Sequence, residues 1–349
     1  MKAIIVVDKE KAEIQEVSRP AVRDGFVLVK VNTLGLNPTD WKTITYRAVP
    51  GINMRVGADY AGIVEEVGNG VTNLKKGDRV AGVVMGGHQL EPDFGAFGDY
   101  LITQAALQIK IPDNITDEQA ATIGVSMVTA AQGLYKILEL PFPTTPAKEP
   151  YPILIYGGST ATGVYGIQFA KASGLTVVAT ASPRNFEYLK SLGADAVFDY
   201  NSPTCAADIK AFTNNALKLA WDCSGDGGEI CAAALSDAET SRYATIVPVE
   251  REVVAAINPK VEGPIFHLAY DVFNSPYVWL DGSTVPAKPD EYEFAAKFVA
   301  LVPGLLANGT VKPIRTALNQ GGSGLEGVLK GLEDLKAGKV SGTKLVYTL

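Results

Sequence analysis

Short apolar segments rich in β-branched residues recur through the first third of the chain, with turn residues between them. Five segments are expected to form strands: Ala3–Val7, Phe26–Val31, Gly62–Val67, Arg79–Val84 and Tyr100–Thr103. Turn dipeptides such as Asn69-Gly70 separate them. Because helical periodicity is weak in this region, the pattern predicts a compact β-barrel-like domain.

The pattern changes near residue 115, where Thr116 precedes two acids and Gln119 in the arrangement of a helix start. After the proline-rich stretch 141–152, strand and helix patterns alternate. The predicted strands are Ile153–Tyr156, Thr176–Thr180, Ala196–Asp199, Leu217–Trp221 and Tyr243–Val247. The predicted helices are Val164–Ser173, Asn185–Leu192, Ala207–Asn214 and Glu229–Leu235. This alternation predicts a parallel sheet with helices on both faces.

The C-terminal part gives weaker signals. The stretch 260–290 holds several prolines and the aromatic group from Phe266 to Trp279, which could line an acyl channel but fits an ordinary core equally well. A last helix is expected over Glu291–Ala307, and a last strand near Lys344–Tyr347.

Composition excludes several classes of protein. The 349 residues are 47% hydrophobic and carry a net charge of −7, which disfavours a surface built for nucleic acid. No apolar run approaches the length of a membrane helix. Three cysteines in a chain of this length favour a reducing compartment, so a cytoplasmic protein is expected.

The strongest local signal follows the strand Ile153–Tyr156 and runs directly into a helix. It extends from Gly157 through Ser159, Thr160, Ala161 and Thr162 to Gly163 and Gly166. Ala161, Gly163 and Gly166 match the dinucleotide fingerprint with alanine in first place, so phosphates are expected at the helix N-terminus. A glycine-rich helix start without a ligand is the simpler alternative.

The residues after the second strand favour NADP over NAD. An NAD site usually places an acid here to hold the ribose 2′-hydroxyl, but this chain has Ser182, Pro183, Arg184 and Asn185. The guanidinium of Arg184 can pair with a 2′-phosphate. The alternative is that Arg184 is a solvated turn residue.

Several motifs together resemble the medium-chain dehydrogenase/reductases over nearly the whole chain. They are residues 37–42, 57–64, 76–80 and 95–100, which occur in that family's order ahead of the nucleotide-binding fold. The resemblance implies an α/β protein with a GroES-like β domain over 1–122 and 286–349. A doubly wound parallel-sheet Rossmann domain that binds NADP is expected over 123–285.

The chain departs from the zinc alcohol dehydrogenases of that superfamily. Asn37 stands where they have cysteine, and Ala58-Asp59 stands where they have His-Glu. No metal is therefore expected. Reduction of an activated C=C bond suits a protein without zinc, because the substrate carbonyl delocalises the charge as an enolate.

The turn 157–163, the Ser182–Asn185 segment, the Asp199-Tyr200 pair and the segment 338–342 resemble fungal trans-acting enoyl reductases of polyketide biosynthesis. This resemblance implies NADPH as the cofactor and a polyketide synthase, or its carrier-bound enoyl thioester, as the partner. Its implied cofactor residues are Thr39, Asp40, Trp41, Lys42, Ser159, Thr160, Ala161, Thr162, Ser182, Pro183, Arg184, Asn185, Tyr200, Val247, Pro248, Val340 and Ser341. Its implied substrate residues are Gly124, Val125, Ser126, Met127, Val128, Thr129, Ala130, Ala131, Phe266, His267, Leu268, Ala269 and Tyr270.

Lys42 is the catalytic candidate, although a lysine here could equally be an exposed surface residue. Tyr46 is a possible proton donor, and Asp59 receives no chemical role. An NADPH quinone oxidoreductase and a non-catalytic nucleotide-binding protein are the alternative functions, because a fold alone does not define a function.

A monomer is expected. The segment 274–289 falls where related enzymes have an edge strand of the nucleotide-domain sheet, and only Tyr277–Leu280 could form a ladder there. Pro276, Pro286 and Pro289 remove backbone donors beside it, which would prevent strand-to-strand pairing.

Overall fold

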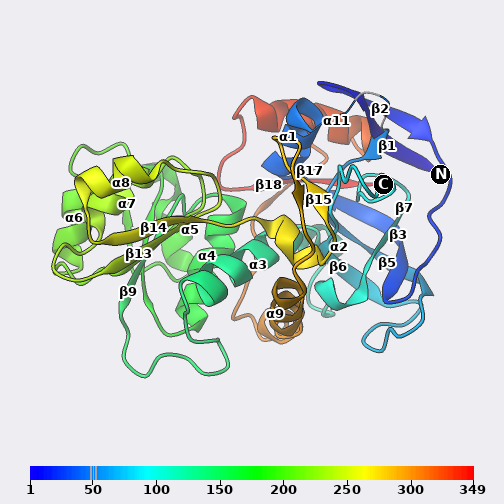
Figure 1. Cartoon of the computed structure of the whole chain (residues 1–349). Coiled ribbons are helices and arrows are strands. Elements are labelled where there is room, and N and C mark those ends of the chain that lie inside the picture. Colours follow the sequence, from blue (N-terminus) through cyan, green and yellow to red (C-terminus); the bar gives the residue numbers. More distant parts are fainter. Residues whose placement is uncertain (48, 50, 52) are drawn as a thin grey trace. The chain divides into compact units, whose positions relative to one another are not determined.

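The chain forms two compact units, each with its own sheet and core. The structure is a computed structural model that describes residues 1–47, 49, 51 and 53–349. Unit 1 comprises Met1–Val128, Tyr270–Gly309 and Pro313–Leu349, and unit 2 comprises Thr129–Ala269 and Thr310–Lys312 (Figure 1). Residues 270–285, expected in the nucleotide-binding domain, therefore fall within unit 1.

Unit 1 is built around a seven-stranded sheet with the order β17-β18-β3-β5-β6-β8, in which β7 also pairs with β3. A smaller sheet has the order β2-β1-β4. The strands are β1 (Lys2–Asp8), β2 (Lys11–Glu16), β3 (Phe26–Gly35), β4 (Met54–Arg55), β5 (Asp59–Val67), β6 (Arg79–Val83), β7 (Tyr100–Gln104), β8 (Gln108–Lys110), β17 (Thr316–Leu318) and β18 (Lys344–Thr348). All five strands predicted in the first third are present, and the GroES-like part of the fold prediction is confirmed.

The helices of unit 1 include two that were not predicted from the sequence, α1 (Pro38–Tyr46) and α11 (Gly324–Lys336). The others are α2 (Asp117–Ala120), α9 (Pro289–Val299) and α10 (Val302–Ala307), together with most of α3 (Gly124–Ala130). α1 was missed because its local signals are capping ones: Pro38 opens it, and the Asp40 carboxylate accepts the Asn37 N–H at 2.7 Å.

Unit 2 is a six-stranded, wholly parallel sheet with the order β11-β10-β9-β12-β13-β14. Its strands are β9 (Pro152–Tyr156), β10 (Thr176–Thr180), β11 (Ala196–Phe198), β12 (Leu219–Asp222), β13 (Ser241–Thr245) and β14 (Val261–Phe266). Counted from β9, the order is 3-2-1-4-5-6, which is the Rossmann order. The doubly wound part of the fold prediction is confirmed.

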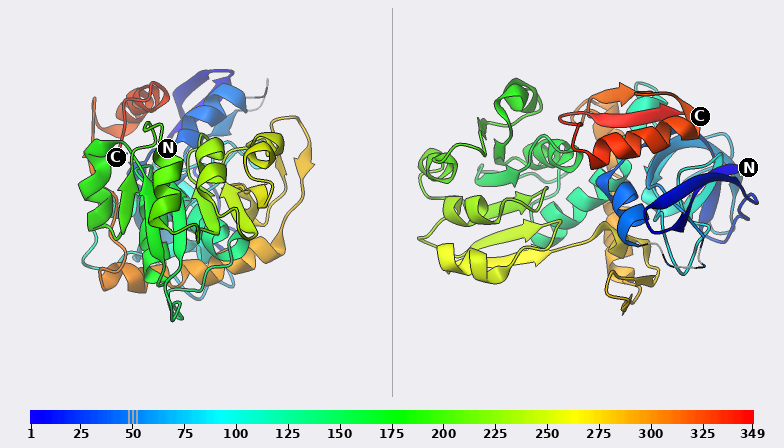
Figure 2. Two further views of the ribbon diagram at one scale, coloured as in Figure 1. Left: turned by 90° about the vertical axis from the view of Figure 1, so that its left-hand side faces the viewer. Right: turned by 90° about the horizontal axis from the view of Figure 1, so that it is seen from above.

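Helices cover both faces of this sheet (Figures 1 and 2). They are α4 (Ala161–Ala172), α5 (Phe186–Ser191), α6 (Cys205–Phe212), α7 (Gly228–Ala234) and α8 (Arg251–Ile257). A core of apolar side chains from α6, α7, α8 and the strands lies on one face. The strand order reverses between β9 and β12, and folds of this kind bind their ligands at the carboxyl ends of the two strands at such a reversal.

Two predictions for the C-terminal half are wrong. The helix expected over Glu291–Ala307 is divided into α9 and α10, because Pro303 lacks an N–H and its ring would clash with the preceding turn. Residues 274–289 do not provide an edge strand of the parallel sheet. They form a separate hairpin in which β15 (Tyr277–Val278) pairs with β16 (Thr284–Val285), and the edge strands of the parallel sheet are β11 and β14.

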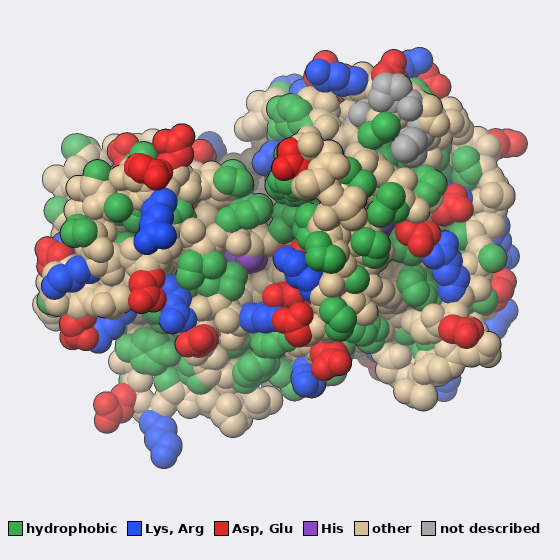
Figure 3. Space-filling view, viewed as in Figure 1, with side chains coloured by type: hydrophobic (Ala, Val, Ile, Leu, Met, Phe, Trp, Pro, Cys, Tyr) green, Lys and Arg blue, Asp and Glu red, His purple; other side chains and the backbone are tan. Residues whose placement is uncertain are grey.

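The face of the molecule shown in Figure 3 carries no concentration of one charge. On the face shown in Figure 3, acidic and basic side chains are interspersed between apolar and neutral ones. Within the described residues, no helix has both the length and the apolar character of a membrane span.

Candidate cofactor and substrate sites

The glycine-rich turn of unit 2 is held by its own backbone and by the strand beside it. Gly157 has a positive φ of 75° and donates its N–H to the Thr180 hydroxyl at 3.0 Å, while the Gly158 N–H bonds the Thr180 carbonyl at 2.9 Å. Thr160 caps α4 by accepting the Gly163 N–H at 3.0 Å. The remaining N–H groups at this helix start and the positive end of its dipole suit a pyrophosphate.

Two glycines of the fingerprint are required by close packing inside unit 2. A Cβ on Gly163 would lie 2.4 Å from the Gly157 carbonyl oxygen, so this glycine lets the helix start fold back onto the turn. A Cβ on Gly166 would lie 2.6 Å from the Trp221 ring, so this glycine lets α4 pack against β12. The glycine-rich turn and the start of α4, residues 157–166, are here called the cradle. The cradle requires both glycines even when no ligand is bound.

Ser182–Asn185, which follow β10 and include no acid, and Tyr200, which follows β11, supply polar side chains at the ends of these two strands. The Ser182 and Tyr200 hydroxyls are 3.0 Å apart, and Tyr200 is 39% exposed. Arg184 is exposed and forms no ion pair with any described residue. This donor set fits the 2′-phosphate of NADPH, because it supplies a guanidinium and two hydroxyls to a dianion.

The loop after β12 supplies another wall of the cradle that the sequence analysis missed. The Asp222 carboxylate accepts hydrogen bonds from the N–H groups of Ser224, Gly225 and Gly227 and from the Tyr243 hydroxyl. A Cβ on Gly157 would lie 3.4 Å from Ser224, and one on Gly225 would lie 2.4 Å from Val247. The signal that could have found this loop is an acid that ends a buried strand and precedes Ser-Gly-Asp-Gly-Gly.

The predicted cofactor residues are thus divided between the units. Ser159–Gly163, Ser182–Asn185, Tyr200, Val247 and Pro248 lie around the carboxyl ends of the unit 2 strands. Thr39–Lys42, Val340 and Ser341 belong to unit 1, the last two in the connection between α11 and β18.

The predicted residues on α1 have different environments. Lys42 is exposed, with its Nζ 5.8 Å from the centre of the Trp41 ring. The Thr39 hydroxyl is 2.6 Å from the Tyr270 hydroxyl, which joins a predicted cofactor residue to a predicted substrate residue. Asp40 is buried, and this burial raises its carboxyl pKa to about 8. Its carboxyl group accepts the Asn37 N–H and therefore stabilises the helix start.

A buried lysine, Lys344, binds Asn37 and Asp59, two of the positions at which the sequence resemblance led us to expect no zinc ligand. Lys344 Nζ donates to the side-chain oxygens of Asn37 and Asp59 and to the Thr122 carbonyl. The second Asp59 oxygen accepts the Val125 N–H at 2.6 Å. These residues do not fit zinc, because an ammonium already binds the available oxygens and no cysteine or histidine is present. Within the described part of the chain, no three metal-ligating side chains converge.

The predicted substrate segment 124–131 begins α3 and is nearly all buried. Gly124 is required there, because a Cβ would lie 2.1 Å from the Gly82 carbonyl oxygen and 2.5 Å from Asp59. The Ser126 hydroxyl is buried and has no hydrogen-bond partner among the described residues. It is therefore a polar group of unit 1 that a ligand could satisfy.

The other predicted substrate segment, 266–270, follows β14. His267 is 7% exposed, and its Nε2 accepts the Trp221 Nε1–H at 3.0 Å. Burial lowers the His267 pKa to about 4, so the ring is neutral and its proton lies on Nδ1. That Nδ1–H has no partner among the described residues. Next to this pair runs a π-helical turn over Ala131–Ile137, in which a Cβ on Gly133 would lie 2.4 Å from Trp221.

Comparison with known proteins gives the class that this architecture defines. The "Alcohol dehydrogenase GroES-like domain" model matches residues 23–113, and the "Zinc-binding dehydrogenase" model matches residues 161–238. The chain is an oxidoreductase of the medium-chain dehydrogenase/reductase class.

The relatives place it more narrowly. It is 40% identical to trans-enoyl reductase ACTTS2 of Alternaria alternata, over 100% of this chain and 98% of that protein. It is also 40% identical to trans-enoyl reductase resD of Aspergillus sclerotiorum, with 99% of each covered. The protein belongs to the trans-enoyl reductase family.

Solved structures share the fold. The CurK enoyl reductase matches with a TM-score of 0.76 and 18% identity, over 99% of this chain and 98% of that one. Mycobacterial Rv1454c, complexed with NADPH, matches with a TM-score of 0.71 and 20% identity, over all of both chains.

Proposed function

We propose that this protein is a trans-acting enoyl reductase that uses NADPH to reduce the C=C bond of an α,β-unsaturated polyketide thioester. The observation that carries this proposal is the cradle of unit 2, a glycine-rich turn at the Rossmann switch point, combined with Ser182, Arg184 and Tyr200 in place of an acid. The relatives named trans-enoyl reductases support the choice of reaction.

The cofactor would be held by the residues of the cradle and by those after β10 and β11. The start of α4, with Ser159–Gly163, suits the pyrophosphate, and Arg184 with Ser182 and Tyr200 suits the 2′-phosphate. When bound, NADPH supplies the hydride. Thr39–Lys42, Val340 and Ser341 are proposed to complete the cofactor site from unit 1, as the family resemblance implies.

The protein's part in the reaction is to bind the substrate carbonyl and stabilise the charge that develops on its oxygen. Two polar groups of unit 1 in the proposed binding regions are available for this: Lys42 and the Ser126 hydroxyl. An ammonium and a hydroxyl can each donate a hydrogen bond to an enolate oxygen. Of these, Lys42 is our candidate for the catalytic residue.

The proposed partner is a polyketide synthase that presents the substrate on its carrier domain. We also propose a monomer, on grounds that differ from the expected edge at Tyr277–Leu280. Of the two edge strands of the unit 2 sheet, β11 is only three residues long, and Pro264 within β14 has no N–H to offer another strand. Light scattering should give the 36.9 kDa mass of one chain; twice that mass would overturn this proposal.

The function is tested by supplying NADPH with crotonyl and longer enoyl thioesters, and separately with quinones. We expect oxidation of NADPH with the thioesters and formation of the saturated acyl products. Turnover of quinones alone would favour the quinone oxidoreductase alternative. Nucleotide binding without turnover of either class would favour a non-catalytic protein.

A further inference from the structure

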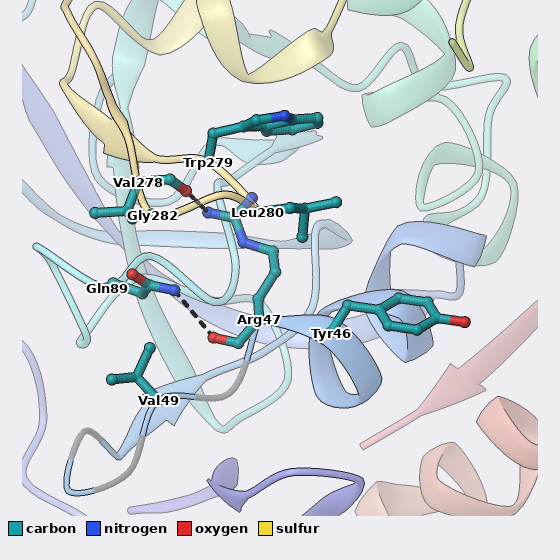
Figure 4. Close-up of a pocket in the computed structure, with 8 residues that line it drawn as sticks. All are labelled: Tyr46, Arg47, Val49, Gln89, Val278, Trp279, Leu280 and Gly282. Carbon is teal, nitrogen blue, oxygen red and sulfur yellow. Dashed lines mark hydrogen bonds between the residues drawn. The ribbon is translucent and has the colours of Figure 1, made fainter. Parts of the chain in front are cut away.

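A pocket in unit 1, outside the residues predicted from the sequence to bind substrate or cofactor, has the chemistry of an anion site. It has a volume of about 180 Å³ and is lined by Tyr46, Arg47, Val49, Gln89, Val278, Trp279, Leu280 and Gly282 (Figure 4). The lining combines one cation, one amide, two aromatic rings and several aliphatic groups.

Arg47 is the unusual member of this lining. It is only 6% exposed, and its Nη2 donates to the Val278 carbonyl at 3.0 Å. Nε and Nη1 are buried and have no hydrogen-bond partner among the described residues. No carboxylate of the described residues pairs with Arg47 either. A buried guanidinium without a counter-ion is costly, so this arrangement suits a ligand that brings a negative charge.

The surroundings hold the guanidinium in place without neutralising it. Its central carbon lies 4.8 Å from the centre of the Tyr270 ring, and the Gln89 amide donates to the Arg47 carbonyl at 3.0 Å. Asp271, the acid beside Tyr270 in the chain, already binds the Tyr277 hydroxyl and Lys288, each at 2.8 Å. Among the described residues, the positive charge of Arg47 therefore has no carboxylate partner.

The pocket is linked to the proposed substrate region through Tyr270. The ring of Tyr270 lies against the Arg47 guanidinium, and its hydroxyl hydrogen-bonds the Thr39 hydroxyl on α1. Tyr270 therefore contacts both the pocket and a predicted cofactor residue. At the rim, Tyr46 is 60% exposed and Leu280 is 57% exposed, which offers apolar contact next to the cation. A matching ligand has an oxyanion adjacent to a compact apolar group.

We propose that this pocket binds the phosphate and the neighbouring dimethyl group of a phosphopantetheine arm, with Arg47 as the phosphate ligand. The inference rests on the proposed function, because enoyl thioesters are carried on this arm both by carrier proteins and by coenzyme A. The pocket is large enough for these groups and too small for the whole arm. Arg47 thus contributes to recognition of the carrier, separately from the reacting acyl group.

Binding is measured first, because it does not depend on turnover. Calorimetry with 4′-phosphopantetheine and with pantetheine compares two probes that differ only in the phosphate. We expect the wild type to bind the phosphorylated probe at least tenfold more tightly, since a charge-assisted contact separates the two. Arg47→Gln should remove this preference, and Arg47→Lys should keep part of it, because lysine retains the charge but loses the planar fork.

The matched control is Arg251→Gln, an exposed arginine on α8 that should leave the preference unchanged. Equal binding of the two probes by the wild type would overturn the proposal, even if Arg47→Gln failed to fold. The proposal would also be overturned if a folded Arg47→Gln protein kept the same preference for the phosphorylated probe as the wild type.

Turnover then separates this inference from the proposed function. Crotonyl-phosphopantetheine should have a kcat/KM at least tenfold above that of crotonyl-pantetheine, and Arg47→Gln should reduce that ratio to about one. Reduction of both thioesters at equal kcat/KM leaves the function standing and refutes the phosphate site. A phosphate preference in binding without reduction of either thioester refutes the function and supports the site. Crotonyl-CoA and crotonyl-carrier protein show which source of the arm depends on Arg47.

Discussion

The glycine-rich cradle of unit 2 and the buried polar centre of unit 1 are built in opposite ways. The cradle uses backbone groups within a short stretch of chain, and its glycines permit close contacts such as the one between Gly163 and Gly157. The polar centre uses charged side chains from segments far apart in the sequence, with Lys344 bonded to Asn37 and Asp59. One site is formed by local geometry and the other by compensation of buried charge.

This difference predicts different responses to mutation. A backbone cradle fails when an added atom displaces it, and its loss should appear first in nucleotide binding. A buried charge centre fails when one partner is removed, because the remaining charge has no water to solvate it. Its loss should appear first in the stability of unit 1.

The largest effect is expected for Lys344→Met. The substitution leaves the Asp59 carboxylate buried without its cation, which should lower the free energy of unfolding by about 3–5 kcal/mol. Urea denaturation measures the change. Lys336→Met is the control, because Lys336 forms an exposed pair with Glu10 and should change stability by less than about 1 kcal/mol. If the two substitutions cost the same, Lys344 does not hold the centre together.

Arg184→Ala should weaken NADPH binding at least tenfold and affect NADH little. Loss of a charge-assisted contact costs about 1.5–3 kcal/mol, and only NADPH carries the 2′-phosphate. Fluorescence titration with both nucleotides gives the two dissociation constants. If the wild-type protein bound NADPH and NADH equally, the residues after β10 would not form a 2′-phosphate site.

Gly163→Ala tests the backbone cradle with a single added carbon. Its Cβ would lie 2.4 Å from the Gly157 carbonyl oxygen and 2.8 Å from the Gly158 Cα, so the turn must shift, at about 1–3 kcal/mol. Both thermal stability and NADPH affinity should fall. Gly304→Ala is the matched control, since its Cβ meets open space in α10 and should stabilise the protein slightly. A Gly163→Ala protein as stable as the control would show that the turn is not tightly packed.

The smallest effect expected is the pH dependence contributed by Asp40. Burial raises the Asp40 pKa to about 8 in the folded protein, against an ordinary value of 3.8, so the folded state holds more protons between these two values. Stability from this group is therefore lost as the pH rises from about 4 to 8. Asp40→Asn should remove this pH dependence. Its free energy of unfolding, compared with that of the wild type, should therefore rise by about 1 kcal/mol as the pH goes from 7 to 8.

Denaturation at pH 6, 7 and 8 measures this difference between Asp40→Asn and the wild type. Asp281→Asn serves as the control, because its exposed carboxylate has a lowered pKa and stays ionised throughout that range. A difference between Asp40→Asn and wild type that does not change with pH would show that Asp40 is ionised when folded.

The sequence predicted what depends on neighbouring residues and missed what depends on distant ones. The strands predicted for the first third and for the nucleotide-binding part, the turn at Gly157 and the Thr116 cap follow from local patterns, and they are present, whereas β14 was not predicted. The Lys344 contacts span more than 200 residues, and nothing near Lys344 in the sequence indicates its burial. Arg47 was missed for the same reason, because its partner Val278 lies 231 residues away. The assignments of Lys42 and Ser126 to the reaction, and of His267 to the substrate site, stay predictions.

Reduction of an enoyl thioester by NADPH is tested most directly by labelling the hydride that is transferred. NADPH deuterated at the transferable position of the nicotinamide is supplied with a crotonyl thioester, and the product is examined by mass spectrometry and NMR. An NADPH-dependent enoyl reductase should form a butyryl thioester with one deuterium at the β-carbon, and should form it faster with NADPH than with NADH. If the protein binds NADPH and oxidises it with quinones but leaves the thioester unreduced, it is not an enoyl reductase.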